Sequence, residues 1–447
     1  MDYKALAEGI VKKALTLGAD EAETFVENRR EFTLRVRNED VETIKQATSK
    51  GIGLTVFRDE KLGFSYTSDL SEESIEEFAK KTVQLSLVAD SKPWNGLPDV
   101  SEGKIRDLDL YDPSVSDIPN DKKIKIAKEV EKMALDRDKR ITKSYGSSFG
   151  DTEEEVFLVN SKGVSLSFKN TQVGFSVSVV AGEGNDMQSG GWSSYKRHFK
   201  ELDTIEHVAE KAGKRAVEKL GARPVATQKA SVVYDRYAAG SFWYGILFAM
   251  NGDSVYKKTT FLTDLLEKPV ASELITVTDD PAIPRHISSV PFDGEGKITR
   301  KNILIDKGIL KMFIYDTITA RKAGVQVNTI TRRRGFRSAP YGSFLNVVVQ
   351  NGSESREKLI SGIKNGFYVT ELRGLGTDIP TGNYSCGASG FWIKDGELSF
   401  PVDGVTLGGN ALDMLKRIEA VANDLDLRGG LNSPSFRITE MIIGGKR

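Results

Sequence analysis

The chain of 447 residues contains 63 lysines and arginines and 63 aspartates and glutamates, so its formal net charge is zero. With 39% apolar and 28% charged residues, the composition is typical of folded globular proteins and excludes a disordered or fibrous chain, and the length indicates about three domains or two large ones. The balanced charge excludes a net electrostatic attraction to nucleic-acid phosphates or anionic lipid, although a local basic patch is compatible with it.

Three further features bear on the compartment. Cys386 is the sole cysteine, which excludes a disulfide within the chain and predicts a reducing, cytoplasmic environment. The first residues, MDYKALAEGIVKKAL, mix charges among apolar positions, so we expect no signal peptide. No segment offers the roughly 18 uninterrupted apolar residues that span a bilayer. We therefore expect no membrane partner and no direct nucleic-acid partner.

Residues 1–100 are predicted to form an N-terminal α/β domain with antiparallel hairpins. Apolar residues recur at helical spacing from Leu6 to Leu17, and Gly18 follows where a left-handed cap is favoured. Alternating patterns predict one hairpin with its turn at residues 38–40 and a second with arms at 51–57 and 62–66. Asp69 and Glu72 have the spacing of a capping box for a helix, whose core face we assign to Ile75, Ala79, Val83 and Leu87.

Residues 105–222 are predicted to form a middle domain, which either stands alone or packs with the first as one unit. Residues 92–104 gather proline, glycine and polar residues and indicate a linker before it. A helix is predicted over residues 122–135, followed by a meander of strands over 141–192 with turns at 161–163 and 182–185. A second helix is expected to bear Ile205, Val208, Ala212 and Ala216.

Residues 228–447 are predicted to form a β-rich C-terminal domain with one buried helix. Strands are expected at 231–235 and 344–350, and hairpins at 302–316 and 390–402, with one later helix over about 411–423. Strands and helices do not alternate here, which argues against a doubly wound parallel sheet. The predicted fold class is therefore α+β.

The predicted buried helix covers residues 237–250, within the stretch GSFWYGILFAMNGDSV. Phe242, Ile246 and Ala249 share one stripe, and Trp243, Leu247 and Met250 share the neighbouring one, so the helix is apolar nearly all round. Between Gly240 and Asn251 there is no titratable side chain of the kind that acid–base catalysis needs. From the residues alone, we expect a core helix.

The remaining candidates for chemistry are weak. His198, His207 and His286 lack the spacing of a zinc motif, and Cys386 is expected to be a buried, inert thiol, although a nucleophilic role is the alternative. The segment TRRRGFR at 331–337 is expected to be a solvated loop, with a carboxylate or phosphate clamp as the alternative. Tight turns, rather than a phosphate-binding loop, are predicted from the glycines at 374, 376, 382, 387 and 390.

Five collinear segments together resemble the TldD/PmbA family over nearly the whole chain. The resemblance implies an N-terminal α/β region, a middle region, a β-rich C-terminal domain, and a two-subunit metalloprotease in which TldD-like chains hold the metal. The segments are VRNEDVETIKQATSKGIGLTVF (36–57), LGFSYTSDLSEESIEE (62–77), NGDSVYKKTTFL (251–262), TGNYSCGASGFWIKDGELSFPVDGVTLGGN (381–410) and ITEMIIGG (438–445).

The resemblance also implies where a metal site would stand. In the catalytic branch a His-Glu-x-x-x-His motif precedes the Gly-Asp that corresponds to Gly252-Asp253, and counting back places Trp243, Tyr244 and Phe248 at its positions. Those side chains offer zinc no imidazole or thiolate, and no cysteine follows Phe400 to supply the family's thiolate ligand. The resemblance therefore implies a PmbA/TldE-type, non-catalytic subunit with no catalytic residue, metal or other cofactor of its own.

The partners implied are a TldD-like metalloprotease subunit and unfolded peptide, with a homodimer left open. A β-rich domain can take an extended peptide as an added strand. The groove is expected to involve Arg332, Arg333, Arg334, Asn383 and Tyr384. Two alternatives stay open: an independent metallopeptidase that uses the three histidines with carboxylates, and a non-proteolytic regulatory protein of the DNA gyrase modulator type.

Overall fold

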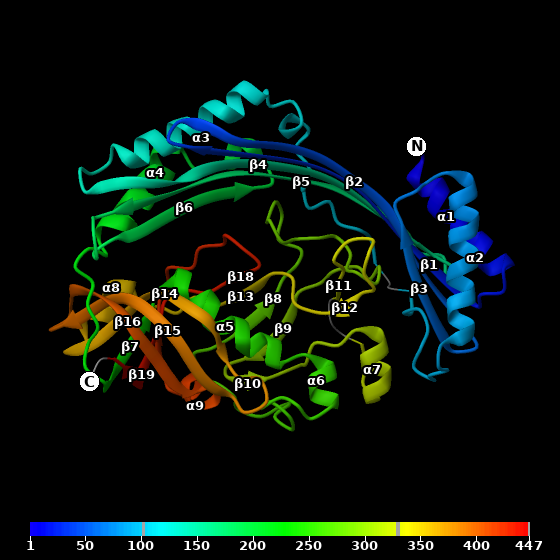
Figure 1. Ribbon diagram of the computed structural model, residues 1–447. Coiled ribbons are helices and arrows are strands. Elements are labelled where there is room, and N and C mark those ends of the chain that lie inside the picture. The colour runs from blue at the N-terminus through cyan, green and yellow to red at the C-terminus, as the bar shows by residue number, and fades with distance from the viewer. Residues whose placement is uncertain (101–102, 328–330, 446–447) are drawn as a thin grey trace.

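A curved antiparallel sheet arches over a β-rich C-terminal region in the computed structural model of the chain (Figure 1). The structure describes residues 1–100, 103–327 and 331–445. The mixed α+β class agrees with the sequence prediction. No helix within the described ranges is long and apolar enough to cross a membrane.

The arched sheet combines the predicted N-terminal and middle regions. Its strand order is β3-β2-β1-β4-β5-β6, and each neighbouring pair is antiparallel. Because β1 pairs with β2 on one side and with β4 on the other, the two regions share one sheet. The strands are β1 (Glu21–Arg37), β2 (Asp40–Arg58), β3 (Lys61–Thr67), β4 (Ile141–Asn160), β5 (Ser165–Ala181) and β6 (Gln188–Lys196). Both N-terminal hairpins and the meander are confirmed, but β1 and β2 run much longer than predicted. The domain boundaries themselves stay a prediction.

Four helices pack on the outer face of the arch, one pair at each end (Figure 1). Apolar residues of the first pair pack with Ala22, Val26 and Leu54, and those of the second pair pack with Phe149, Val173 and Val177. The helices are α1 (Tyr3–Thr16) and α2 (Glu72–Val88) at one end, and α3 (Asn120–Leu135) and α4 (Ile205–Val217) at the other, and short 3-10 turns lie at η1 (Pro113–Val115) and η2 (Phe199–Glu201). All four helices were predicted.

The predicted capping box at the start of α2 is wrong. Ser71 is the N-cap and its side chain makes no capping hydrogen bond. Asp69 lies outside the helix, where it accepts hydrogen bonds from the Ser71 backbone N–H at 3.0 Å and the Ser74 hydroxyl at 2.7 Å. The spacing between Asp69 and Glu72 was therefore not enough to identify a cap, because the helix begins two residues later than that motif requires.

The C-terminal region is built on a sheet that closes on itself. Its order is β16-β15-β14-β7-β19-β17, and β16 also pairs with β19, so β16, β15, β14, β7 and β19 form a ring. The strands are β7 (Gln228–Tyr234), β14 (Asn365–Thr377), β15 (Asn383–Lys394), β16 (Glu397–Asn410), β17 (Ile418–Val421) and β19 (Phe436–Gly444). The β15–β16 hairpin confirms the prediction for residues 390–402. Inside the ring and on its flank lies an extensive apolar core.

Smaller elements surround this ring. A second sheet has the order β10-β9-β8-β13-β18, and a short pair of strands stands apart from it. The strands are β8 (Val277–Asp279), β9 (Asn302–Asp306), β10 (Ile309–Leu310), β13 (Val347–Val349) and β18 (Leu431–Asn432), with β11 (Thr331–Arg332) and β12 (Tyr341–Gly342) as the separate pair. The helices are α5 (Arg236–Ala249), α6 (Gly252–Tyr256), α7 (Thr317–Ala323), α8 (Arg356–Ser361) and α9 (Ala411–Lys416). The strand predicted at 231–235 is present as β7 and begins three residues earlier, whereas the strands predicted at 302–316 and 344–350 are shorter than predicted.

One predicted helix is shorter in the structure. The helix expected over 411–423 ends at Lys416, and Ile418–Val421 forms β17, which pairs with β19. The apolar residues of this segment fit both periods, and pairing with a distant strand decided the outcome. In the linker predicted over 92–104, residues 101 and 102 lie outside the described residues, and the rest forms no helix and no strand.

Candidate functional site

Helix α5 lies beneath the arch, where the resemblance places the metal motif of the catalytic branch (Figure 1). The carboxylate of Asp235 caps its N-terminus by accepting a hydrogen bond from the Tyr237 backbone N–H at 2.9 Å. The helix ends at Ala249, and Asn251 then caps α6 through the backbone N–H groups of Asp253 and Ser254. The polar Asn-Gly-Asp that closes the apolar stretch is therefore a helix junction.

The three positions of the expected metal motif point in different directions. Trp243 is 0% exposed, and its ring packs against Phe242 and Phe436 with centroids 5.7 and 6.2 Å away. Tyr244 and Phe248 are 42% and 41% exposed, and their ring centroids lie 4.6 Å apart. The prediction of a helix buried all round is therefore wrong on one face, because the i and i+4 positions 244 and 248 face away from the ring core.

Phe344 completes an aromatic cluster on this open face. Its ring meets Tyr244 edge-on at 6.2 Å and Phe248 at 5.8 Å between centroids. Edge-to-face packing of this kind is favourable and holds the three rings in a defined arrangement. We call Tyr244, Phe248 and Phe344 the α5 aromatic cluster.

The donor chemistry at α5 does not fit a catalytic zinc ion. Zinc is held by imidazole, thiolate or carboxylate groups, and the three motif positions carry an indole, a phenol and a phenyl ring. Within residues 1–100, 103–327 and 331–445, no three histidine, cysteine, aspartate or glutamate side chains gather as a metal site would require.

The three histidines serve other contacts. His198 meets the Asp109 backbone oxygen through Nε2 at 2.8 Å, and His207 lies exposed in the first turn of α4. His286 is buried, and burial together with the neighbouring Arg197 and Lys196 lowers its pKa to about 4. The imidazole of His286 is thus held neutral at physiological pH.

A groove runs along the exposed face of α5. A cavity of about 390 Å³ is lined by Tyr237, Gly240, Ser241 and Tyr244 of the helix together with Gly374 and Leu431. The helical members recur at spacings of three and four residues, so they form one stripe. Glycine and serine in the middle of that stripe leave room between the two tyrosines. We call this the α5 groove.

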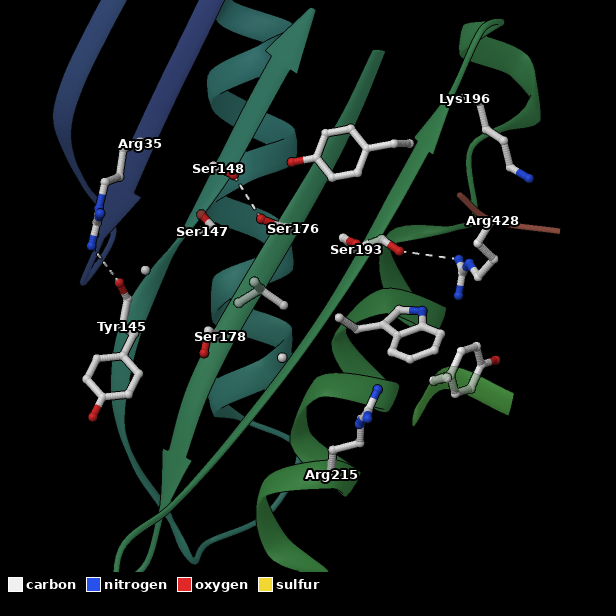
Figure 2. A pocket seen from close by; sticks show the side chains of 16 residues that line it. Arg35, Tyr145, Ser147, Ser148, Ser176, Ser178, Ser193, Lys196, Arg215 and Arg428 are labelled. Carbon is white, nitrogen blue, oxygen red and sulfur yellow. Dashed lines mark hydrogen bonds between the residues drawn. The ribbon is translucent and has the colours of Figure 1, made fainter. Parts of the chain in front are cut away.

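A larger cavity, of about 580 Å³, shares Tyr237 with the α5 groove. It lies against the arched sheet, and Figure 2 shows serine side chains of β4 and β5 across its floor, with Arg35, Lys196, Arg215 and Arg428 around it. The sequence reasoning did not identify this cavity. The alternation of Ser176 and Ser178 along one strand is visible in the sequence, but the pairing of that strand with its neighbours is not.

Of the three arginines assigned to a peptide groove, Arg333 is not available to a ligand. Its side chain is 2% exposed, and its guanidinium forms an ion pair with Glu23 of β1, whose side chain is 3% exposed. Its Nε also donates to the Gly294 backbone oxygen at 2.5 Å. Arg332 and Arg334 are exposed, and Arg332 borders a cavity of about 210 Å³ between the arch and the C-terminal region. Residues 331–334 therefore form a contact between the arch and the C-terminal region, and the prediction of a solvated loop is wrong for Arg333.

Buried carboxylates lie near this contact between the arch and the C-terminal region. Burial raises the pKa of Glu23, and Arg333 offsets part of this effect. Burial and the nearby Glu295 raise the pKa of Asp293 to about 6. Asp293 accepts a hydrogen bond from the Thr331 backbone N–H at 3.0 Å, so the same cluster holds β11 in place.

The other two assigned groove residues separate as well. Asn383 is exposed at the start of β15, whereas Tyr384 is 3% exposed and packs inside the ring, 5.8 Å from Phe242 between centroids. The assignment of Tyr384 to a groove is therefore wrong, because alternation along the strand turns it inward. Cys386 is buried two residues later and burial raises the pKa of its thiol, as expected of an inert cysteine.

Three family models match the chain: PmbA/TldA metallopeptidase domain 1 at residues 22–86, the PmbA/TldA metallopeptidase central domain at 113–220, and the PmbA/TldA metallopeptidase C-terminal domain at 227–445. Metalloprotease PmbA of Escherichia coli O157:H7 is 30% identical, with 99% of this chain and 97% of the relative covered.

Two solved structures have a similar fold. A candidate modulator of DNA gyrase from Bacteroides thetaiotaomicron superposes with a TM-score of 0.92 at 27% identity and covers 100% of both chains. TldE from Thermococcus kodakarensis superposes with a TM-score of 0.89 at 23% identity, over 98% of this chain and 100% of that one, which supports the fold alone. The sequence resemblance and the matched models agree along the chain, and the chain belongs to the PmbA/TldD family of metalloprotease-like proteins.

Proposed function

We propose that this chain is a cytoplasmic, non-catalytic subunit of the PmbA/TldE type. It pairs with a TldD-like metalloprotease subunit, and the pair binds and processes unfolded peptides. The single observation that carries the proposal is the donor set of α5, where Trp243, Tyr244 and Phe248 replace every group that could bind zinc or activate its water.

The shape of the α5 region supports a peptide-binding role. The α5 groove is open, and the partly exposed rings of Tyr244 and Phe248 from the α5 aromatic cluster lie at its end. Aromatic side chains with large accessible surface are typical of binding sites, because each buries much apolar area with little loss of side-chain entropy. A peptide in the α5 groove would lie beside Tyr237 and Tyr244.

The test is reconstitution. We expect the purified chain alone to leave unfolded peptides intact, and a mixture with a TldD-like protein to form a stable complex by size-exclusion chromatography and to cleave them. A stable pair of this kind buries more than about 1,000 Å² in total. Cleavage by the chain alone that a chelator abolishes would contradict the proposal and favour an independent metallopeptidase.

A second candidate function is regulation without proteolysis. The observation that favours it is the likeness, at 27% identity over the whole chain, to the Bacteroides protein described as a candidate modulator of DNA gyrase. An affinity capture from lysate in which gyrase subunits are recovered and no TldD-like chain appears would favour this alternative.

A further inference from the structure

The floor of the 580 Å³ cavity is a patch of small residues on neighbouring strands of the arch. Arg35 of β1 pairs with Ser148 of β4, Ser148 with Ser176 of β5, and Ser176 with Ser193 of β6, so the four form one row across the sheet. The next row contains Gly146, Ser178 and Gly191 in register. Side chains this small leave the sheet surface open over two rows.

The floor carries hydroxyl groups that can donate hydrogen bonds. The Ser148 and Ser176 hydroxyls lie 2.8 Å apart and bond to each other. In the described part of the chain, the hydroxyls of Ser178 and Ser193 have no hydrogen-bond partner. A ligand that accepts hydrogen bonds therefore finds free donors here.

The charged residues around the floor are all cationic. Among the residues that line the cavity there are arginines and a lysine, and no aspartate or glutamate. Arg35 and Arg428 already have acidic partners outside the lining, Glu42 at 2.8 Å and Asp203 at 2.5 Å. These two arginines are therefore largely neutralised.

Arg215 and Lys196 are different, because neither has an ion-pair partner among the described residues. The Arg215 guanidinium carbon lies 5.2 Å from the Trp192 ring and 5.9 Å from the Tyr237 ring. Stacking of a guanidinium on aromatic faces leaves its N–H edge free, and that edge matches the two oxygens of a carboxylate. In Figure 2, Arg215 and Lys196 come to the cavity from α4 and the end of β6.

We propose that this cavity is a subsite for a carboxylate of the peptide that lies in the α5 groove, bound by Arg215 and the serine hydroxyls, with Lys196 adding positive charge at the other side of the cavity. The two cavities share Tyr237, so a chain lying along α5 comes next to the cavity with the serine floor. The carboxylate belongs either to an Asp or Glu side chain or to the C-terminus of the peptide. The inference rests on the proposed function only in taking peptide as the ligand.

The experiment is fluorescence anisotropy with the full chain and labelled, unstructured peptides of otherwise equal sequence. One peptide contains glutamates and an amidated C-terminus, one has glutamine at those places and an amidated C-terminus, and one has glutamine with a free C-terminal carboxylate. We expect one of the two carboxylate-bearing peptides to bind about tenfold more tightly than the neutral peptide, the value for one charge-assisted contact. Which one binds identifies the source of the carboxylate.

Variants locate the site. R215Q/K196Q should remove the tenfold preference, whereas the control K4Q/K12Q, which removes two exposed lysines of α1 at the far end of the arch, should keep it. S178L fills the floor without a change of charge and should also remove the preference. Circular dichroism melting checks that each variant is folded, and K196Q alone, which leaves the Arg215 stacking intact, should lower the preference if the double variant does not fold.

Three results would overturn the inference. They are equal affinity for all three peptides, an equal loss in R215Q/K196Q and K4Q/K12Q, and tighter binding of a single-stranded oligonucleotide than of any peptide. The proposed function is tested independently of the subsite, because pairing with a TldD-like subunit is measured by size-exclusion chromatography. A chain that pairs and supports cleavage but has no carboxylate preference would refute only the subsite.

Discussion

The division of labour on α5 can be tested by comparing Trp243→Ala with Phe248→Ser. Trp243 is 0% exposed, and replacing a fully buried Trp or Phe by alanine costs about 3–5 kcal/mol of unfolding free energy. Phe248 is 41% exposed and has only part of that burial to lose, so we expect a cost of about 1–2 kcal/mol. The two variants should therefore differ by about 1–4 kcal/mol.

The indole nitrogen sharpens this expectation. Nε1 of Trp243 is buried without a hydrogen-bond partner in the described structure, and an unsatisfied buried donor costs about 1–3 kcal/mol. Trp243→Phe removes that donor as well as part of the packing, so we expect it to cost far less than Trp243→Ala. Urea unfolding followed by far-ultraviolet circular dichroism gives the three free energies from the midpoint and slope.

Peptide affinity should show the opposite order. Phe248→Ser removes a ring of the α5 aromatic cluster and should weaken peptide binding about tenfold, as expected for a ring that a ligand covers. Trp243→Phe leaves the open face unchanged and should bind normally. Equal destabilisation by Trp243→Ala and Phe248→Ser, or normal peptide binding by Phe248→Ser, would refute the assignment of one side of α5 to the core and the other to a ligand.

Three further predictions concern the arch and its junction with the C-terminal region. Arg333→Met breaks the buried ion pair with Glu23 and should lower the free energy of unfolding by about 3–5 kcal/mol, and adding Glu23→Gln should restore part of that free energy. A double-mutant cycle measured by urea unfolding that shows no coupling between the two positions would contradict the buried pair. The pKa of His286 is lowered to about 4 in the folded chain, below the unfolded value near 6.5, so the unfolded chain binds more protons between these pH values. Acidification through this window should therefore lower the free energy of unfolding by at most about 3 kcal/mol. His286→Gln should lose this pH dependence, while the opposing contributions of Asp279 and Asp293, whose pKa values are raised, remain. Gly190→Ala should lower the free energy of unfolding by about 1–3 kcal/mol, because a Cβ there would lie 2.2 Å from the Ala216 backbone nitrogen of α4. In the control Gly9→Ala, the new Cβ meets open space inside α1. The melting temperature should therefore fall for the first variant and not for the second.

Local pattern was enough to predict the arch but not the surface that it offers. The hairpins of β1 to β3 and the meander of β4 to β6 follow from strict alternation and clear turn residues, which act over a few neighbouring positions. The serine floor needs more, because Ser148, Ser176 and Ser193 come together only through the registers of three strands. The burial of Arg333 depends on Glu23, which lies 310 residues away in the chain.

For α5, composition predicted the helix and misjudged its exposure. A helix that is apolar nearly all round gives no periodic signal for an open face, so Tyr244 and Phe248 could not be told apart from Trp243. The same ambiguity misled the interpretation of residues 418–421, whose apolar side chains fit a helix or a strand until β19 is placed beside them. In both cases a contact distant in sequence decided the outcome.

The fold depends on the two sides of α5 to different degrees. The fold needs the side of α5 that carries Trp243, and it places little demand on positions 244 and 248, whose side chains are about two-fifths exposed. A polar residue at position 248 would cost about 1–2 kcal/mol, less than the roughly 3–5 kcal/mol expected for alanine at position 243. Both rings pack edge-on against Phe344, and about two-fifths of each side chain stays exposed. In the proposed function, an apolar part of a peptide or of a TldD-like subunit would cover this exposed surface.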